Sequence, residues 1–338
     1  MLLIVVDAMG GDNAPNDIVK GCVDAINEQE GFDITLLGDC KRIEKILSEN
    51  KFNNNRICIK NTTEVITNDD IPTKSIKNKK DSSMVAGFNM LKQNNGDVFV
   101  SCGNTGALLT GATLILGRIK GIDRPALAPV IPTRKGGALL IDAGFNTVCK
   151  PVNYLQFGIM GSIYMKEIFN IDKPRVGLIN VGSEEIKGNE TIRQAYTLLA
   201  NSSVHFVGNV EGREIPNGEV DVAVCDGFVG NVLLKFLEGV GSFIYDGLKE
   251  VYYKNFISKL SSFLVRGELK KFKKKLDYEE YGGVPVLGIN GTVFKCHGNS
   301  NAKSFKKSIL NAYSFAKSTF MDQIKQEISR MEVDNVGV

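Results

Sequence analysis

The sequence contains little histidine, no tryptophan and neither of the common nucleotide-binding patterns. Only His205 and His297 occur among 338 residues, so a mechanism built on a histidine triad or a strong histidine base has few candidates. Neither G-x-x-x-x-G-K-[ST] nor G-x-G-x-x-G is present, which argues against a P-loop ATPase and a standard dinucleotide site. The seven cysteines form no Cys-x-x-Cys pair, so neither a zinc site nor a redox dithiol is indicated.

Strong net charge and long apolar runs are also missing. A net charge of +3 and a hydrophobic content of 43% are typical of ordinary globular proteins and give no sign of a nucleic-acid partner. Residues 1–7 lack the basic region of a signal peptide and are predicted to form a first strand. No stretch approaches the ~20 apolar residues of a spanning helix. We therefore expect a cytoplasmic protein that is soluble or lies on a membrane surface.

The order of apolar segments predicts an α/β fold. Strands are predicted at residues 2–6, 33–38, 56–60, 97–101, 137–142, 175–182, 205–209, 220–226 and 284–290, and helices at 16–29, 82–91, 153–168, 190–199 and 302–331. Most of the strands are nearly continuous apolar runs, as strands covered on both faces should be. Their alternation with helices indicates a mostly parallel sheet. Residues 124–133 contain three prolines, which exclude a central strand and favour a crossing between two lobes.

Residues 251–276 form a basic amphipathic segment with two readings. Eight cations and one anion, Glu268, lie between its apolar residues. One reading is a helical hairpin that forms a dimer and exposes a solvated basic face. The other is an interfacial segment drawn to anionic lipids, where each basic group contributes about 1 kcal/mol. The two readings are compatible, and the same segment could bind an acidic carrier protein.

Five turns rich in Gly, Asn and Asp follow apolar runs. They occupy residues 7–12, 101–106, 180–190, 225–231 and 289–291. Ligands of wound α/β sheets bind outside the carboxyl ends of the strands, where glycine lets backbone N–H groups approach an anion. We expect the five turns to share one rim and to form an anion-binding floor.

Side chains on these turns are candidates for chemistry. Lys187, between two glycine turns, is the best cation. Asn231 is either an oxyanion donor or the N-cap of the next helix, and Asn104 with Thr105 has the same two readings. The carboxylates of Asp7, Asp12, Asp142 and Asp226 could bind Mg²⁺ or fix turns through hydrogen bonds. His297 precedes a helix and could face the rim.

The shortage of histidine narrows the reaction. Without a strong general base, a reaction is favoured whose nucleophile is already ionised and whose leaving group departs easily. Orthophosphate attacking a thioester meets both conditions, and the protein would supply positioning and electrostatic stabilisation. An acyl-enzyme on Ser101 or Cys102 is an alternative that lacks an evident base.

The turns resemble a known family when they are taken in order. The resemblance is carried by residues 7–15, 103–107, 124–127, 154–157, 187–190, 208–213 and 226–232. These motifs closely resemble the bacterial phosphate acyltransferases of phospholipid synthesis, the PlsX type. The resemblance implies conversion of acyl-acyl-carrier-protein and orthophosphate into acyl phosphate and free carrier protein, without a cofactor. It also implies a homodimer, peripheral on an anionic membrane, that acts ahead of a glycerol-phosphate acyltransferase.

The fold implied by the resemblance is a three-layer α/β/α unit with a large mixed, mostly parallel sheet, similar to phosphotransacetylase and isopropylmalate dehydrogenase. Two lobes around a cleft are expected, the first at about residues 1–120 plus 286–338 and the second at about residues 121–285. The basic segment 251–276 falls where this family carries its dimer and membrane-contact helices.

Site residues follow by position in the matching motifs. Lys187 and Asn231 look like the catalytic pair. The candidate substrate-binding residues are Asp7, Gly10, Gly11, Asp12, Gly103, Asn104, Thr105, Asn146, Asn180, Asn189, Asp226, Gly230 and His297; no metal ligand is expected. Phe145 stands where the family commonly has alanine and could narrow the cleft or shift Asn146.

Three alternatives remain from the sequence. The first is an NAD- and Mg²⁺-dependent hydroxyacid dehydrogenase on the same fold, which the missing dinucleotide pattern disfavours. The second is a short-chain phosphate acyltransferase that uses coenzyme A thioesters. The third is a regulator without catalytic activity that binds a carrier protein or a membrane.

Overall fold

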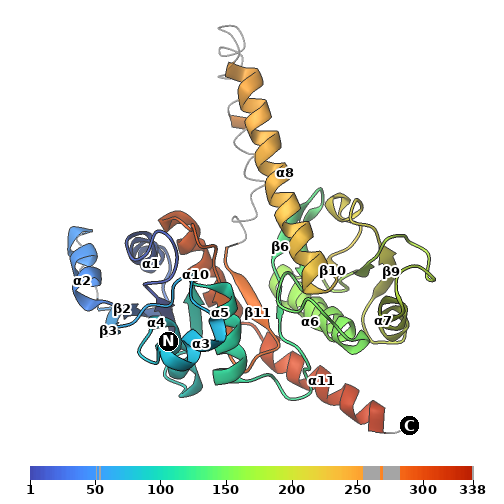
Figure 1. Ribbon diagram of the computed structural model, residues 1–338, viewed down its shortest axis with the longest axis horizontal. Helices are drawn as coiled ribbons and strands as arrows, with labels where there is room; N and C mark the ends of the chain where they lie inside the picture. The colour runs from blue at the N-terminus through green and yellow to red at the C-terminus, as the bar shows by residue number, and fades with distance from the viewer. Residues whose placement is uncertain (51, 53–54, 254–266, 269–281, 337–338) are drawn as a thin grey trace.

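The strands form two sheets (Figure 1). The computed structural model describes residues 1–50, 52, 55–253, 267–268 and 282–336. The basic segment predicted at 251–276 therefore lies outside the described residues, apart from its first three positions and residues 267–268. A seven-stranded sheet has the order β3-β2-β1-β4-β12-β11-β5, and a five-stranded sheet has the order β6-β7-β10-β8-β9.

The seven-stranded sheet is mostly parallel. Its strands are β1 (Leu2–Asp7), β2 (Phe32–Gly38), β3 (Ile57–Asn61), β4 (Val98–Ser101), β5 (Ala126–Leu127), β11 (Val284–Leu287) and β12 (Thr292–Lys295). Strand β12 runs parallel to β4, and β11 runs antiparallel to β12 and to β5. One face is covered by α1 (Asn16–Glu28), α2 (Cys40–Glu49) and α10 (Ala302–Ala316), and the other by α3 (Pro72–Asn78), α4 (Ser83–Lys92), α5 (Thr105–Gly111) and η1 (Ala112–Leu116).

Alternating side chains of β1 show why this sheet needs two helical layers. Ile4 and Val6 belong to the core cluster that contains α1 and α10, whereas Val5 belongs to the cluster that contains α4. All three side chains are completely buried. Since successive residues of a strand point to opposite faces, a continuous apolar run is stable only when both faces are covered.

The five-stranded sheet repeats this arrangement. It contains β6 (Val130–Thr133), β7 (Gly136–Ile141), β8 (Val176–Ile179), β9 (Phe206–Val210) and β10 (Val222–Val224). All neighbours are parallel except β6 and β7. Helices α6 (Pro151–Phe169) and α7 (Glu190–Ala200) cover one face; the base of α8 (Gly227–Tyr253) and η2 (Ile215–Asn217) lie on the other. Helix α11 (Phe320–Val336) packs on α6 through Phe320 and Tyr164, whose ring centroids are 6.0 Å apart.

The sequence-based predictions are largely confirmed. Every predicted strand is present, and the fold is three-layered α/β with mixed, mostly parallel sheets. The helix predicted at residues 302–331 is wrong in one respect, because it is two helices separated at residues 317–319. The proline-rich residues 124–133 supply β5 and β6, each at the edge of a sheet, where a missing N–H is tolerated.

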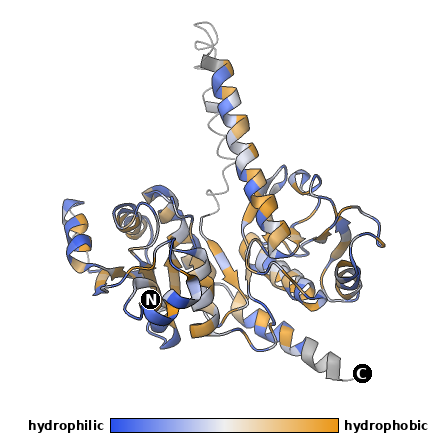
Figure 2. Cartoon of the chain, in the orientation of Figure 1, coloured by the Kyte–Doolittle hydropathy of each residue, from blue (hydrophilic) through white to orange (hydrophobic). Residues whose placement is uncertain are grey.

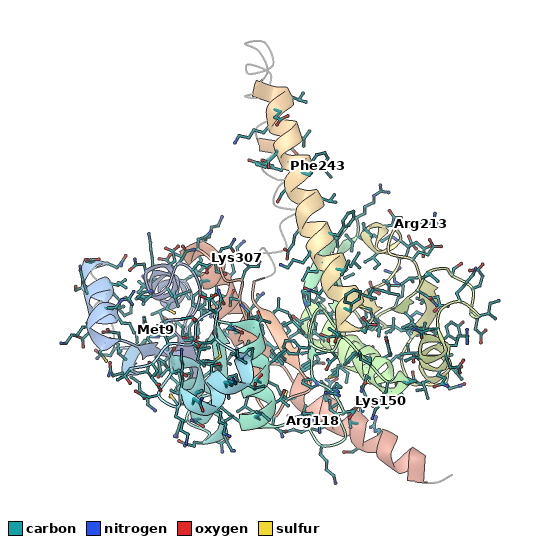
Figure 3. The ribbon with its side chains drawn as sticks, in the orientation of Figure 1. Met9, Arg118, Lys150, Arg213, Phe243 and Lys307 are labelled. Atoms are coloured by element: carbon teal, nitrogen blue, oxygen red, sulfur yellow. The ribbon has the colours of Figure 1, made fainter. Side chains whose placement is uncertain are left out.

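Helix α8 extends far beyond the sheet on which it begins (Figure 1). Its outer part carries exposed apolar side chains, including Phe236, Phe243 and Val251 with 66%, 79% and 63% exposure. Figure 2 shows this apolar character along the projecting helix, and Figure 3 labels Phe243 on it. Residues 227–251 have the length of a membrane-crossing helix and contain an 18-residue window with a mean hydropathy of 1.3. The expectation that no stretch approaches this composition is therefore wrong, although one such helix is weak grounds for a membrane span.

Candidate active site

Three turns meet at the carboxyl edge of the seven-stranded sheet. Strands β1, β4 and β12 are parallel neighbours, so the residues that follow them lie side by side. The amide of Asp12 donates to the carbonyl of Gly298 over 2.7 Å, and the Asn13 side chain donates to the carbonyl of Asn299 over 3.0 Å. We call residues 8–12, 102–106 and 296–300 the turn cluster.

Glycine is required in the turn cluster because the three turns touch. A Cβ on Gly10 would lie 2.5 Å from Asp7 Oδ2 and 2.7 Å from the amide nitrogen of Gly103. At Gly11, φ is +100°, and a Cβ would lie 2.7 Å from the Cβ of Cys102. These positions close the turns against one another, so their backbone groups face a small common space.

The predicted single rim of five turns is only partly correct. The turn at residues 289–291 joins β11 to the antiparallel strand β12. Because Thr292, the first residue of β12, pairs with Val98 at the start of β4, this turn lies at the opposite edge of the sheet. The carboxyl end of β12 supplies residues 296–300 to the turn cluster instead. The turns after β8 and β10 belong to the edge of the five-stranded sheet.

Asp7 holds the turns together from beneath. Its carboxylate accepts a hydrogen bond of 2.7 Å from the Ser101 hydroxyl, which in turn accepts one of 3.0 Å from the amide of Gly103. Burial raises the pKa of Asp7, while hydrogen bonds from serine side chains oppose the shift. Asp7 therefore positions the turn cluster and is not among the residues that line the cavity described below.

Asn104 is an N-cap, which is one of its two predicted roles. Its side-chain oxygen accepts from the amide of Ala107 over 3.0 Å. Its side-chain nitrogen points to the carbonyls of Thr67, Asn68 and Asp70 at 3.2 to 3.4 Å. Both ends of the amide are therefore used to begin α5 and to hold the preceding loop. Thr105, the next residue, lines the cavity.

At the five-stranded sheet, Asn146 and Asp142 form a structural pair. The Asn146 side chain donates to Asp142 over 2.9 Å and to the carbonyl of Pro125 over 2.7 Å. Burial raises the pKa of Asp142 to about 6, and donated amide hydrogen bonds limit the shift. Phe145 donates its amide to the same carboxylate and packs at the edge of the core cluster around α4.

Asp226, and not Asn231, caps α8. Its carboxylate accepts from the amide of Val229 over 2.8 Å and from the Tyr154 hydroxyl over 3.2 Å. The cap reading of Asn231 is therefore wrong, because α8 begins at Gly227 and Asn231 lies within its first turns. A Cβ on Gly230 would lie only 1.9 Å from the Asp142 carbonyl oxygen, so α8 begins in direct contact with the turn after β7.

Lys187 lies on the loop between β8 and α7. Its ammonium is 3.7 Å from Glu184 Oε1, and its side chain is 46% exposed. Asn180 donates to the carbonyl of Lys187 over 3.1 Å, and Asn189 caps α7 through a 3.0 Å bond from the amide of Ile192. Asn180 and Asn189 thus shape the loop that carries Lys187.

A cavity of about 440 Å³ opens between the two sheets and the base of α8. Its polar wall includes Asn231 and residues 102, 103, 105, 296–298 and 300 of the turn cluster, and its apolar wall includes Leu127, Pro129 and Leu234. Of the predicted site residues, Gly103, Thr105, Asn231 and His297 line it. Lys187 is not among the lining residues that the structure describes, so the predicted catalytic pair is not brought together in this cavity.

Lys295 is a cavity residue that the sequence analysis missed. It ends β12, is 9% exposed, and donates from its ammonium to the carbonyls of Cys102, over 3.4 Å, and Cys296. Burial lowers its pKa. The available signal was a lysine directly after the apolar residues 293–294, because lysine is almost never buried without a reason.

Among the residues that the structure describes, no three His, Cys, Asp or Glu side chains form a group able to hold a metal ion. Asp7, Asp142 and Asp226 instead accept the hydrogen bonds of their own turns. Of the two predicted roles, Mg²⁺ binding or fixing turns through hydrogen bonds, the structure shows the second for these three carboxylates.

Comparisons with known proteins agree with the sequence motifs. Residues 2–323 match the family described as fatty acid synthesis protein. A phosphate acyltransferase from Acetivibrio thermocellus is 56% identical over 335 residues, which cover 99% of both chains. A phosphate acyltransferase from Thermoanaerobacter pseudethanolicus is 48% identical over 328 residues, covering 97% of this chain and 98% of that protein.

Solved structures share the fold at low sequence identity. A phosphotransacetylase from Streptococcus pyogenes matches with a TM-score of 0.62 and 15% identity, covering 93% of this chain and 94% of that chain. A branched-chain phosphotransacylase from Enterococcus faecalis matches with a TM-score of 0.56 and 12% identity, covering 94% of this chain and 100% of that chain. The predicted phosphotransacetylase-like architecture is confirmed.

Proposed function

Since this chain belongs to the fatty acid synthesis protein family and is a phosphate acyltransferase, we propose that its acyl donor is a fatty acyl group on acyl carrier protein. The observation that carries the proposal is the two-sided cavity. One wall offers backbone groups and side chains suited to an anion, and the other offers apolar surface from Leu127, Pro129 and Leu234. A fatty acyl thioester needs the apolar wall, whereas orthophosphate needs the polar wall.

The proposed reaction is direct transfer. An oxygen of orthophosphate attacks the thioester carbonyl carbon and forms a tetrahedral oxyanion. Collapse of this intermediate re-forms the carbonyl and breaks the carbon–sulfur bond. The products are acyl phosphate and the pantetheine thiolate of the carrier protein, which takes a proton from solvent. No general base on the protein is needed, because the nucleophile is already anionic.

Asn231 is the proposed oxyanion donor. It lines the cavity close to Gly144, where a Cβ would lie 3.6 Å from the Asn231 side chain. Because Asp226 takes the cap of α8, the Asn231 amide is not committed to that task. A preorganised amide donor of this kind typically contributes about 3–4 kcal/mol to the stability of the transition state.

Lys187 is the cation that we propose to act together with Asn231. Its loop follows β8, which neighbours β10, so it lies at the same sheet edge as the start of α8. The ion pair with Glu184 is 3.7 Å long and exposed, and such pairs contribute little to stability. Lys187 can therefore leave Glu184 and bind a substrate phosphate at little cost in free energy.

An acyl-enzyme on Ser101 or Cys102 has less support. The Ser101 hydroxyl donates to Asp7, and Asp7 itself is a buried carboxyl whose pKa is raised by burial. Burial also raises the pKa of the Cys102 thiol well above its ordinary value, which disfavours the thiolate that would be needed.

Two partners follow from α8. Its outer apolar side chains, Phe236, Phe243 and Val251, are exposed, and a stretch of this kind on a single chain favours burial against another surface. We propose that a second copy of the chain covers part of it in a homodimer and that an anionic membrane surface contacts its far end. Peripheral attachment in the cytoplasm would deliver acyl phosphate to a glycerol-phosphate acyltransferase.

One assay tests the proposed donor. Purified enzyme is incubated with orthophosphate and either long-chain acyl-acyl-carrier-protein or acetyl-coenzyme A, and acyl phosphate is trapped with hydroxylamine. The proposal expects phosphate-dependent consumption of the carrier-protein substrate at a much higher kcat/KM. A preference for acetyl-coenzyme A would establish a short-chain enzyme instead, and binding of carrier protein without turnover would refute catalysis.

A further inference from the structure

A buried lysine lines the cavity. Lys295 lies on β12, between β4 and β11 within the seven-stranded sheet. Among the residues that the structure describes, it is the one lysine that is buried. Its ammonium donates to the carbonyls of Cys102 and Cys296. An ammonium has three N–H donors, so two carbonyl contacts leave one donor for a ligand in the cavity that Lys295 lines.

The charge of Lys295 is not balanced by an adjacent carboxylate. No ion pair joins Lys295 to an acidic side chain in the part of the chain that the structure describes. Cys102 and Cys296, followed by Asp7 and Asp12, act on it electrostatically, and burial favours the neutral form of Asp7. Moving an ammonium out of water without a counter-ion costs free energy. Electrostatic attraction is stronger at a buried site than in water. An anion bound beside Lys295 would therefore offset part of this cost.

The surroundings of Lys295 offer further donors to an anion. Gly298 of the turn cluster and Ser300, just before α10, line the same cavity, whereas the Gly103 amide and the Ser304 hydroxyl already donate to Ser101 and Asn301. Helix α10 runs from Ala302 to Ala316, long enough to place partial positive charge at its first turn. A cation, glycine turns and a helix N-terminus therefore border the same cavity.

We propose that Lys295 binds orthophosphate and holds it against the turn cluster while the acyl thioester enters along the apolar wall. This assignment rests on the proposed function only for the order of events, since the phosphate site itself requires no acyl donor. It differs from the role of Lys187, which lies on an exposed loop at the other sheet and outside the described lining of the cavity.

A cation that binds substrate, as proposed for Lys295, and a donor that acts only in the transition state, as proposed for Asn231, affect the kinetic constants differently. An interaction that is equally strong in the bound and transition states changes KM without changing kcat. Loss of the Lys295 charge should therefore raise the KM for orthophosphate, with a smaller effect on kcat and on the KM for the acyl donor. Loss of Asn231 should lower kcat.

The test uses the full-length protein and three variants. Lys295→Gln keeps amide donors for the two carbonyls and removes the charge, and Lys295→Met removes both. Lys303→Met is the matched control, because Lys303 is an exposed residue on α10 outside the cavity lining. We expect the KM for orthophosphate to rise at least tenfold in both Lys295 variants, with the KM for the acyl donor within about twofold. Lys303→Met should match the wild type.

Thermal unfolding gives a second readout that does not depend on catalysis. Orthophosphate without acyl donor should raise the unfolding temperature of the wild type and of Lys303→Met, and should not change that of Lys295→Gln. A folded Lys295→Gln with wild-type KM and wild-type protection by orthophosphate would overturn the assignment, as would equal increases in both KM values. If orthophosphate protects the wild type and Lys303→Met but not Lys295→Gln, and no acyl transfer occurs, the Lys295 site stands and the proposed function fails.

For variants that do not fold, the wild type alone decides. Cys296 lines the cavity beside Lys295, so bound orthophosphate should slow its alkylation by iodoacetamide, whereas chloride at equal ionic strength should not. Alkylation that is unaffected by orthophosphate would count against the site.

Discussion

Replacing Gly230 by alanine should disturb the site through the backbone rather than through any side chain that touches substrate. A Cβ at this position would lie 1.9 Å from the Asp142 carbonyl oxygen and 3.0 Å from Cys225 Sγ. Carbon–oxygen contacts in proteins are usually about 3.3 Å or longer, so the start of α8 or the turn after β7 must move by roughly 1.4 Å. Overpacking of this kind costs about 1–3 kcal/mol or more.

The displacement should also reduce activity, because Asn231 is the next residue. A misplacement of about 1 Å can cost on the order of 10²-fold in rate. We therefore expect Gly230→Ala to lower both the free energy of unfolding, measured with urea, and kcat for acyl phosphate formation. The matched control is Gly239→Ala, in the same helix, where a Cβ would meet nothing within 4 Å. That variant should be as stable as the wild type or more stable by up to about 1 kcal/mol.

The two alanines separate a steric cause from a general intolerance of α8 to substitution. Wild-type stability and kcat in Gly230→Ala would refute the close approach of α8 to Asp142. Equal losses in Gly230→Ala and Gly239→Ala would show instead that the helix as a whole, and not its first contact, is sensitive.

Three further predictions concern other parts of the chain. Asn231→Ala should lower kcat by about 10²–10³-fold while the fold is kept, measured by hydroxylamine trapping; near-normal kcat would remove Asn231 from the mechanism. Asp221→Asn should cost about 2 kcal/mol at pH 7, because Asp221 accepts hydrogen bonds of 2.9 and 3.0 Å from the Arg175 guanidinium. Burial raises the pKa of Asp221, but these bonds outweigh it and leave the pKa below its ordinary value. The stabilisation is therefore complete above pH ~4, the unfolded pKa, and the difference between variant and wild type in urea unfolding should shrink as pH falls through the folded pKa; a constant difference would refute the ion pair. Phe243→Ser, at a side chain 79% exposed, should leave the free energy of unfolding of the monomer nearly unchanged and weaken self-association, measured by sedimentation; unchanged association would exclude this face from the dimer.

Strands were predictable because burial on both faces leaves a strong trace in the sequence. Residues 2–6 are all apolar and form the body of β1. Strand β12, Thr292–Lys295, was missed because it has only two apolar residues, Val293 and Phe294, and ends in a lysine. The break between α10 and α11 was missed because residues 317–319 contain no glycine or proline, the usual signals of a helix end.

Site positions were harder to predict because hydrogen-bond partners are set by tertiary structure. The sequence left Asn104 with two readings, and the partners of its amide decide for the cap. It also left Asn231 with two readings, and the cap on Asp226 decides against one of them. In each case several polar groups lie near the helix start, and the folded structure decides which of them forms the capping hydrogen bond. Composition and spacing do not determine this.

Strand direction explains the largest revision of the site. Glycine-rich turns look alike in sequence whether they follow a parallel strand or close a hairpin. The reversal between β11 and β12 moves residues 289–291 to the far edge of the sheet and brings the end of β12 beside Cys102. This register brings the Lys295 ammonium to the carbonyl of Cys102.

The same strand pairing indicates that the two sheets contribute different parts of the site. The carboxyl edge of the seven-stranded sheet presents a rigid, buried cation, because Lys295 is fixed within a strand and the glycine turns around it touch one another. The edge of the five-stranded sheet presents side chains at the start of α8 and on the exposed loop of Lys187. A rigid site suits a small anion that must be held in one orientation, whereas an exposed loop suits a cation that reaches the reacting phosphate after the bulky donor has entered. Orthophosphate is therefore expected to bind first at the seven-stranded sheet, and the acyl thioester to meet it from the side of α8.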